Sequence, residues 1–423
     1  YLVYAHDLSV RGAHIDDTHV YFNGPAVFLR AKGLEALPHE VIIEKMSGAV
    51  VSDWRVATTM PPVDIDDRGF GRYRTPGYDL LIDYPVEISA AAQVEFVVDR
   101  VPHRMVLTGR QHADLDQIAE DIAKICLVHG EMFGLPLPVE QYLFLVTVVK
   151  DGYGGLEHRD STSLLCSRDD LSVGGEKVSE GYRRFLGLCS HEYFHLWNVK
   201  RIRPARFADS DLSGEAYSDM LWAFEGFTSY YDDLALVRSG VIPADAYLEL
   251  LAQSVTRLMR NGGRQRQSIA ESSFYAWTKF YKQDENAPNA IVSYYTKGAL
   301  VAFGLDMTLR ARSGGETSLD DVMRLLWNSY GQSETAVPEG GIERVVANVA
   351  GRDMADFFAA YVYGTGELPL VEWLREVGVG MRLQPARDQK DKGGIGNPGN
   401  APPSTKAVLG SSFAAEPGGV RLT

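Results

Sequence analysis

The chain contains few cysteines for its length. Three cysteines in 423 residues are too few, and odd in number, for a disulfide framework. We interpret Cys126, Cys166 and Cys189 as small core residues. No uninterrupted apolar run is long enough to span a membrane, so a membrane-spanning helix is not expected. The composition is compatible with both the cytoplasm and the periplasm and leaves the compartment open.

Positive charge is also scarce. The formal net charge is -14, and the basic residues are scattered apart from a short run between Lys200 and Arg206. Nucleic-acid binding needs a basic patch, so we expect no nucleic-acid partner. An acidic surface mildly favours cationic ligands such as peptide amines, although its main effect is on solubility. The oligomeric state is left undetermined by the sequence.

Histidine is absent after His195, and this absence limits how a metal site can be completed. His191, Glu192 and His195 form an HExxH motif within a predicted helix that starts near Val178. Residues four apart share one helix face, so two imidazoles can bind one Zn²⁺ while Glu192 reaches its water. A catalytic zinc usually takes three protein ligands, and here the third cannot be a downstream histidine, which leaves a carboxylate or an upstream histidine.

Two downstream glutamates are candidates for this third ligand. Glu215 follows a polar segment that predicts the start of a helix, where an acid simply complements the helix dipole. Glu225 is the lone acid in a strongly apolar stretch, where a carboxylate needs a partner such as a metal ion. Its neighbour Gly226 is unfavourable within a helix unless another element approaches closely. We therefore predict Glu225 as the ligand.

The chain is predicted to be an α+β multidomain protein. Residues 1–108 alternate apolar and polar in short runs, such as Tyr1 to Val10 and Val94 to Val98, which predicts an antiparallel β-sandwich. A helix should start at Asp114 with Gln117 placed for a capping box, and a strand should span Tyr142 to Val149. Later helices are expected at 246–260, 295–312, 318–329 and 355–363. This pattern predicts domains at 1–108, 109–242 and 243–384, the last of them helical.

Residues 385–423 change in character. Asp388 to Lys406 is rich in glycine, proline and charge, which is typical of a linker. The last segment, from Val408 to Thr423, is strand-like.

Four segments together resemble a known family. They are residues 154–162 (GGLEHRDST), 191–204 (HEYFHLWNVKRIRP), 221–231 (LWAFEGFTSYY) and 293–300 (SYYTKGAL). In order and spacing they resemble the glycyl aminopeptidases of peptidase family M61, which are gluzincins related to the M1 aminopeptidases. The resemblance implies a thermolysin-like catalytic domain with one Zn²⁺ on His191, His195 and Glu225. Members often carry a C-terminal PDZ domain, and the end of this chain resembles the opening strands of one.

The same resemblance assigns substrate-binding residues. Gly154, Gly155, Glu157 and His158 are similar to the GxMEN-type motif of the M1 enzymes, in which the glutamate binds the substrate's free amine and the glycine-containing strand lets the substrate backbone approach. His158 stands where that pattern has an asparagine.

A tyrosine is expected to stabilise the oxyanion. Tyr295 stands two residues before a Lys-Gly pair, as in the M1 enzymes, and Tyr294 is the alternative. If both lay on a helix, neighbouring side chains would point about 100° apart and only one would face the metal.

These residues predict a zinc aminopeptidase. Glu192 would act as general base, Tyr295 would stabilise the oxyanion, and Glu157 would limit cleavage to the first residue of peptides with a free N-terminus. The family implies a preference for glycine, alanine or another small residue. The alternatives are a zinc endopeptidase of the gluzincin type and a non-catalytic binding module. Glu192 argues against the last of these, because metal binding alone does not require it.

Overall fold

The structure is a computed structural model that describes residues 1–45, 51–175, 178–386, 388, 390–395, 413–416 and 419–422. The chain divides into two compact units that are not continuous in sequence. The first comprises Tyr1–Arg203, Tyr231–Ile242 and Trp327–Thr335, and the second comprises Pro204–Tyr230, Pro243–Leu326 and Ala336–Thr423. The domain boundaries predicted at 108, 242 and 384 remain predictions.

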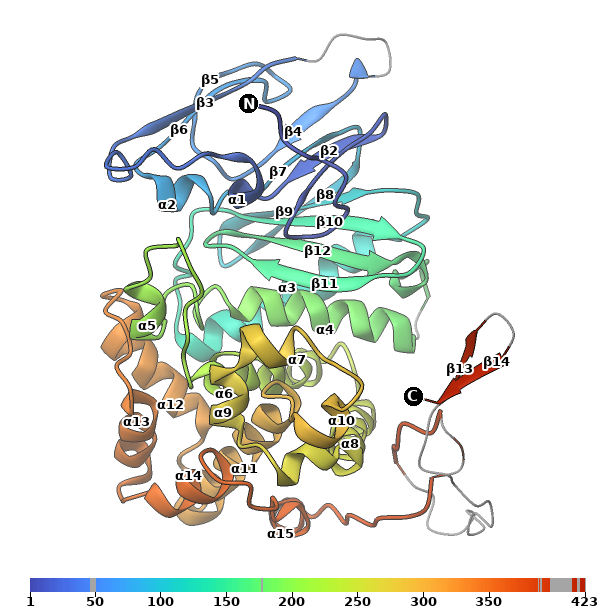
Figure 1. The fold of residues 1–423 in the computed structure, drawn as a ribbon, viewed down its shortest axis with the longest axis vertical. Coiled ribbons are helices and arrows are strands. Elements are labelled where there is room, and N and C mark those ends of the chain that lie inside the picture. Colours follow the sequence, from blue (N-terminus) through green and yellow to red (C-terminus); the bar gives the residue numbers. More distant parts are fainter. Residues whose placement is uncertain are drawn as a thin grey trace. The chain divides into compact units, whose positions relative to one another are not determined.

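Two small antiparallel sheets open the first unit (Figure 1). One has the order β1 (Ala13–Ile15), β2 (His19–Phe22), β7 (Val86–Ser89), β4 (Arg55–Ala57), and the other has the order β3 (His39–Ile43), β6 (Gly71–Thr75), β5 (Pro62–Ile65). Both contribute to one hydrophobic core, which includes Tyr73 of β6 and Val86 of β7. Two short helices, α1 (Gly24–Val27) and α2 (Tyr78–Leu81), interrupt the strands. These sheets confirm the predicted β-structure of the N-terminal part.

The run from Tyr1 to Val10 departs from the prediction. It forms no strand, and its one bridge pairs His6 with His14 in the antiparallel sense. Short alternation without a second flanking strand does not provide enough ladder hydrogen bonds for a full strand.

A five-stranded sheet forms the centre of the first unit. Its order is β11 (Tyr153–Glu157), β12 (Ser161–Ser167), β10 (Tyr142–Val149), β9 (Val101–Thr108), β8 (Ala92–Val98). β10 runs parallel to β9 and β12, and the other neighbours are antiparallel. The sheet takes strands from both sides of residue 108. Strand β11 lies at its edge, which leaves one side of its backbone without a ladder partner in this sheet.

Two long helices, α3 (Leu115–Phe133) and α4 (Glu180–Phe194), pack against this sheet and against each other (Figure 1). Asp114 caps α3 by accepting a hydrogen bond from the backbone of Gln117, as predicted. The reciprocal half of the capping box is absent, because the Gln117 side chain contacts Gly175 and Ser172 instead. Ser179 caps α4 in the same way, through the backbone N–H of Tyr182.

The second unit is helical, as expected for the C-terminal part. Its helices are α5 (Ala205–Ala208), α6 (Leu221–Phe224), α8 (Ala244–Arg260), α9 (Ile269–Phe274), α10 (Ala287–Ala290), α11 (Thr296–Ser313), α12 (Leu319–Leu326), α13 (Gly341–Ala350), α14 (Ala355–Tyr361) and α15 (Leu370–Glu376). Helix α7 (Gly226–Arg238) starts here and ends in the first unit. Helix α11 is buried around most of its circumference, which makes it the central helix of this unit.

The close approach predicted at Gly226 is present. A Cβ at Gly226 would lie 2.6 Å from the Cα of Gly298, and one at Gly298 would lie 2.8 Å from the carbonyl oxygen of Trp222. The start of α7 therefore touches α11 backbone to backbone, which only glycine permits.

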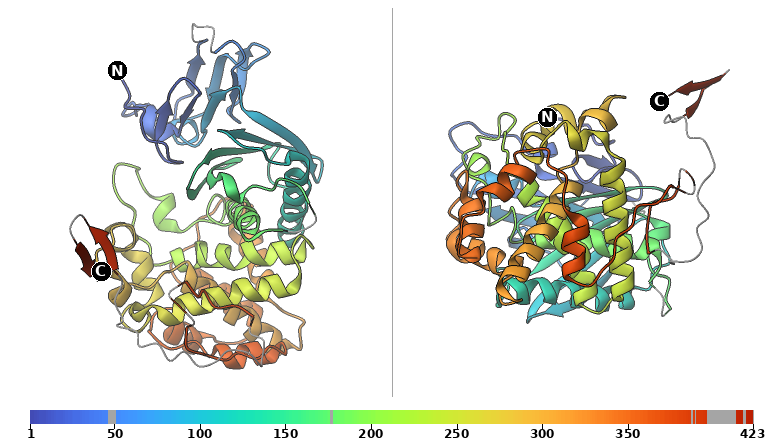
Figure 2. Two further views of the ribbon diagram at one scale, coloured as in Figure 1. Left: turned by 90° about the vertical axis from the view of Figure 1, so that its right-hand side faces the viewer. Right: turned by 90° about the horizontal axis from the view of Figure 1, so that it is seen from below.

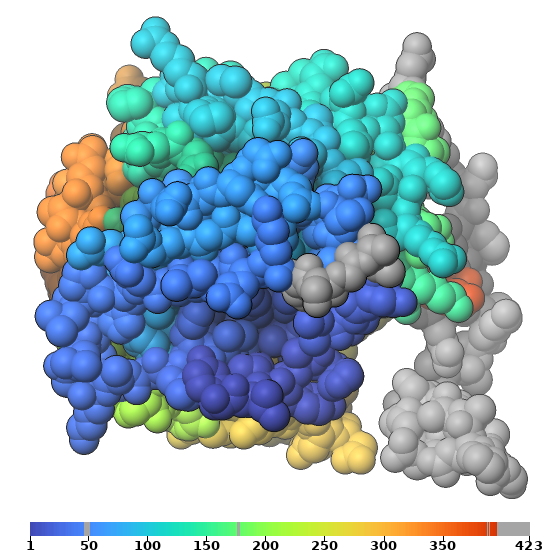
Figure 3. Space-filling view, turned by 90° about the horizontal axis from the view of Figure 1, so that it is seen from above, coloured from blue at the N-terminus to red at the C-terminus, as the bar shows by residue number. Residues whose placement is uncertain are grey.

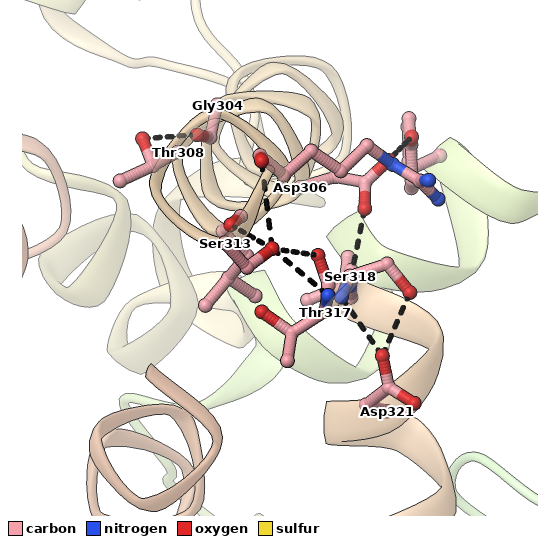
Figure 4. A network of polar contacts seen from close by, with 11 residues as sticks. Gly304, Asp306, Thr308, Ser313, Thr317, Ser318 and Asp321 are labelled. Carbon is pink, nitrogen blue, oxygen red and sulfur yellow. Dashed lines mark hydrogen bonds and ion pairs between the residues drawn. The ribbon is translucent and has the colours of Figure 1, made fainter. Parts of the chain in front are cut away.

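Asp306 joins α11 to the next helix (Figure 4). Its Oδ1 accepts the backbone N–H of Leu319 at 2.8 Å, and its Oδ2 accepts the Tyr230 hydroxyl at 2.8 Å and the Arg310 guanidinium at 3.0 Å. Nearby, Ser318 donates to Asp321 at the start of α12. The buried carboxylate is thus fully paired, as burial requires.

Strands β13 (Phe413–Glu416) and β14 (Gly419–Leu422) form an antiparallel hairpin near the C-terminus (Figure 2). The predicted strand-like segment from Val408 falls partly outside the described residues, so the PDZ-like end stays a prediction. Among the helices described, none has the length and apolar character needed to cross a membrane.

Candidate metal centre

Helix α4 carries the three residues of the HExxH motif. His191 and Glu192 lie in its last turn and His195 is its C-cap, so the helix ends within the motif. The imidazole rings of His191 and His195 lie 4.8 Å apart between centroids, nearly perpendicular to each other. Buried apolar residues on the same helix, such as Tyr193, pack against the sheet through Tyr142. The motif is therefore fixed to a rigid scaffold.

The Nδ1 atom of each histidine lies within hydrogen-bond distance of an oxygen. His191 Nδ1 lies 3.0 Å from Asp232 Oδ2, and His195 Nδ1 lies 2.8 Å from the carbonyl oxygen of Asn198. Partners of this kind orient metal-binding histidines and leave Nε2 to the metal. The donor set therefore fits a divalent metal ion such as zinc.

Asp232 was not predicted from the sequence. It lies on α7, and burial raises the pKa of its carboxyl, while the hydrogen bond and charge of His191 act to lower it. The one sequence signal is its spacing. Asp232 follows Glu225 by seven residues, about two helical turns, so the two share a helix face.

Glu225 connects two helical segments in one run. Its N–H donates to the carbonyl oxygen of Leu221 at 2.7 Å, and its own carbonyl accepts from Ser229 at 2.8 Å, so the helix is continuous through this residue. The alternative ligand Glu215 is exposed in a loop and accepts the Tyr217 hydroxyl. The helix start predicted near Glu215 is wrong, since the polar residues there form turns and α6 begins only at Leu221.

A second carboxylate lies beside the HExxH motif. Ligand atoms of Glu157, Glu192 and His195 all lie within 4.8 Å of one another. Glu157 is the last residue of the edge strand β11, and Glu192 is buried on α4. Two carboxylates therefore lie close together at this corner of the first unit.

The two glycines of strand β11 differ in their surroundings. A Cβ at Gly155 would collide with the carboxylate of Glu192, whereas a Cβ at Gly154 would meet no atom within 4 Å. We predicted both glycines as places where substrate approaches. The structure adds another reason for glycine at position 155, because a larger residue there would collide with the Glu192 side chain. Substrate approach at both glycines stays a prediction.

His158 is placed away from the surface. Its side chain is 3% exposed, and its Nδ1 lies 3.5 Å from Asp83. This burial favours a structural role over the predicted direct contact with substrate. Asp83 also accepts Lys200 Nζ at 2.7 Å and the backbone N–H of Arg159 at 2.8 Å. Burial alone would raise the pKa of Asp83, but Lys200 and His158 hold it below its usual value.

The basic run after α4 serves the fold. Arg201 is buried and donates to the carbonyl oxygens of Leu196, Pro138 and Arg159 at 2.8 to 3.0 Å, and burial lowers its pKa to about 10. Lys200 and Arg201 therefore tie the end of α4 to neighbouring loops.

In the second unit, Tyr294 and Tyr295 precede α11, and their rings stack 4.7 Å apart. The helical divergence of 100° does not apply to these two side chains, because α11 starts at Thr296 and neither tyrosine lies within it. The hydroxyls of both reach Tyr281, at 3.3 Å from Tyr294 and 2.9 Å from Tyr295. Tyr294 is 1% exposed, whereas Tyr295 is half-buried. Tyr281, which was not predicted, completes the cluster.

Comparisons with known proteins identify the family of this chain. Residues 184–301 match the family model described as M61 glycyl aminopeptidase, and residues 1–90 match the peptidase M61 N-terminal domain. No curated protein matches the chain. An aminopeptidase N family protein from Idiomarina loihiensis is similar in structure, with a TM-score of 0.93 and 40% identity over 99% of this chain and 70% of that chain.

More distant structures share the fold alone. An M1 zinc metallopeptidase from Deinococcus radiodurans has a TM-score of 0.55 at 15% identity, over 87% of this chain and 75% of that chain. Aminopeptidase A of Legionella pneumophila, in complex with aspartic acid, has a TM-score of 0.51 at 14% identity, over 83% of this chain and 38% of that chain.

Proposed function

This chain belongs to the M61 glycyl aminopeptidase family, and from that premise we propose that it is a zinc-dependent aminopeptidase. The family and the similar structures support a metallo-aminopeptidase. The proposal adds one Zn²⁺ and, as substrate, peptides with a free N-terminus and a small first residue such as glycine or alanine. The carrying observation is that Asp232 holds His191 Nδ1 and the carbonyl oxygen of Asn198 holds His195 Nδ1, an arrangement that orients histidines for metal binding.

His191, His195 and Glu225 would hold this ion, because two imidazoles and one carboxylate are a common ligand set for catalytic zinc. The position of Asp232 supports Glu225, because Asp232 contacts His191 from α7, which starts directly after Glu225, and Asp232 lies about two turns beyond Glu225 on the same face. When bound, zinc would polarise the scissile carbonyl and lower the pKa of the attacking water.

Glu192 is the proposed general base. Its carboxylate is fixed between helix α4 and strand β11, where Gly155 makes room for it. From there Glu192 would take the proton of the attacking water and pass it to the leaving amine. The buried position keeps bulk water from competing for that proton.

Glu157 is the proposed anchor for the substrate's amine. It ends the edge strand β11, whose outer backbone groups are available to pair with an extended peptide. An ammonium group held by Glu157 places the first peptide bond, and no later one, at the metal. The neighbouring Glu192 adds negative charge that favours the same cation.

Tyr295 is the proposed donor to the oxyanion. Its hydroxyl is oriented by Tyr281, as a preorganised donor requires. Tyr294 is the less suitable of the two, since its side chain is almost completely buried.

A screen of amino-acid p-nitroanilides tests the proposal. We expect hydrolysis of the glycine and alanine compounds, its loss with a chelator, its return with Zn²⁺, and no activity in Glu192→Ala. Activity that survives both the chelator and the substitution would overturn the zinc mechanism. Cleavage of peptides with blocked N-termini would instead favour the alternative, a zinc endopeptidase.

A further inference from the structure

A second cluster of metal-ligating side chains lies far from the HExxH motif in sequence, at the first β-hairpin of the chain. Ligand atoms of His14, Asp16 and His19 all lie within 4.8 Å of one another. His14 is on β1, His19 starts β2, and Asp16 lies in the turn between them. We propose that these three residues form a structural site for a zinc-type divalent cation, distinct from the peptidase centre.

The geometry of the first two ligands fits a tetrahedral ion. His14 Nε2 lies 3.2 Å from Asp16 Oδ2. Two ligand atoms bound at about 2.0 Å to a tetrahedral zinc lie about 3.3 Å apart, so only a small adjustment is needed. The other oxygen of Asp16 is held by the backbone and hydroxyl of Thr18 and by the backbone of His19, at 2.6 to 3.1 Å. The turn thus fixes the carboxylate with Oδ2 toward His14.

The third ligand has an oriented ring. His19 is 5% exposed, and its Nδ1 lies 3.3 Å from Glu87, which is 2% exposed. Thr108 donates to the other carboxylate oxygen of Glu87 at 2.8 Å. This carboxylate–histidine pair repeats the arrangement of Asp232 and His191 and leaves His19 Nε2 to a metal. A buried glutamate used in this way needs a cationic neighbour, and a bound ion would supply one.

A further imidazole lies on the same side of the hairpin. His6 pairs with His14 in an antiparallel bridge, and the flanking hydrogen bonds are made by Ala5 and Asp7 rather than by His6. Directly opposed residues in such a pair have their side chains close together on one face. In Figure 3 the start of the chain, drawn in the darkest blue, lies at the surface of the face shown. Asp16 is exposed and His14 is partly exposed, so an ion can reach the cluster from solvent.

The composition of the cluster indicates the class of metal. Two imidazoles and one carboxylate suit Zn²⁺, Co²⁺ or Ni²⁺, and they suit Ca²⁺ and Mg²⁺ poorly because these prefer oxygen ligands. Neither carboxylate at the site is placed to act as a general base, because Asp16 would be a ligand and Glu87 holds His19. Hydrolysis is therefore not expected there. The ion would stabilise the hairpin, which the contact between His19 and Glu87 joins to β7.

The test separates this site from the peptidase centre. The double variant His191→Ala/His195→Ala is stripped with chelator and titrated with Zn²⁺ by calorimetry, and with Co²⁺ by visible absorption. We expect close to one equivalent of tight binding and an intense tetrahedral Co²⁺ spectrum. Adding His14→Ala and His19→Ala should abolish both signals, and Glu87→Gln should weaken binding about 10- to 100-fold. Adding His112→Ala, an exposed histidine of the same unit, is the matched control and should change nothing.

Two further measurements keep the result interpretable. Circular dichroism establishes that each variant is folded, and Zn²⁺ should raise the melting temperature only where His14 and His19 are present. With the peptidase ligands intact, His14→Ala/His19→Ala should retain aminopeptidase activity while losing one equivalent of metal. Zero stoichiometry in the His191→Ala/His195→Ala variant, or binding that persists without His14 and His19, would overturn the site. Neither result depends on whether the chain hydrolyses peptides.

Discussion

Two histidine pairs in the first unit are alike in their support and different in their setting. His191 Nδ1 lies 3.0 Å from Asp232 Oδ2, and His19 Nδ1 lies 3.3 Å from Glu87 Oε2. Each pair therefore has one imidazole oriented by a carboxylate. One pair lies a turn apart on α4, and the other lies across the β1–β2 hairpin.

The two histidine pairs differ in the roles of the carboxylates beside them. Beside the helical pair, Glu192 and Glu157 are carboxylates outside the proposed ligand set, next to an edge strand. At the hairpin, Asp16 would be a ligand and Glu87 supports one. Histidine ligands alone do not make a proposed metal site hydrolytic. Hydrolysis also needs a general base outside the ligand set and a strand or surface that binds the substrate.

The largest expected effect comes from removing the base at the helical pair. Glu192→Gln should lower kcat for glycine p-nitroanilide about 10²- to 10⁴-fold, because general base catalysis contributes about that much. Metal content measured by mass spectrometry should stay as in the wild type. Loss of the metal together with activity would assign Glu192 to metal binding and would remove the contrast between the two pairs.

The next effect comes from displacing the base without removing it. Gly155→Ala should lower kcat about 10²-fold, because its Cβ would push the Glu192 carboxylate out of place. The matched control is Gly154→Ala, one residue earlier on the same strand, where a Cβ meets no neighbour within 4 Å. Steady-state kinetics on both variants check this. Equal losses in both would point to substrate contact and away from the position of Glu192.

A smaller effect concerns Asp232 and Glu87, the carboxylates that orient one histidine of each pair. Asp232→Asn should weaken zinc binding at the peptidase centre about 10- to 100-fold, with activity largely restored by excess Zn²⁺. Competition with a chromogenic chelator measures the affinity. Glu87→Gln is the paired variant, which should leave aminopeptidase activity and its zinc dependence unchanged. If both variants shifted the zinc dependence of activity equally, the two pairs would not be independent.

The smallest effect concerns Asp160, which lies between strands β11 and β12 of the central sheet. Burial raises the pKa of its carboxyl to about 6. The folded state therefore binds more protons than the unfolded state between pH 4 and 6, and stability should fall as pH rises through that window. The contribution is at most about 3 kcal/mol for a shift of two units. Denaturant unfolding of Asp160→Asn should show a flatter pH dependence there, and an unchanged slope would contradict this origin.

Much of the fold followed from local patterns in the sequence. The α4 helix, strand β10 and the helices of the second unit have strong periodicity, and Gly226 signalled its contact with Gly298 by its unfavourable position. The metal-binding motif was readable for the same reason, since its residues are neighbours on one helix.

What the sequence did not reveal depends on tertiary contacts. Asp232 is an ordinary helix acid until its distance to His191 is known, and Glu87 is an ordinary strand acid until it faces His19. The stacking of Tyr294 on Tyr295 was missed because the helix boundary, and with it the direction of the two side chains, depends on one residue.

The most direct test of the central claim compares a free and a blocked substrate. Glycine p-nitroanilide and its N-acetyl derivative are offered to the wild type and to Glu157→Gln. The wild type should cleave only the free-amine compound, and Glu157→Gln should lose most of that activity while keeping its zinc. Comparable cleavage of the acetylated compound by the wild type, or full activity in Glu157→Gln, would contradict an amine-anchored aminopeptidase.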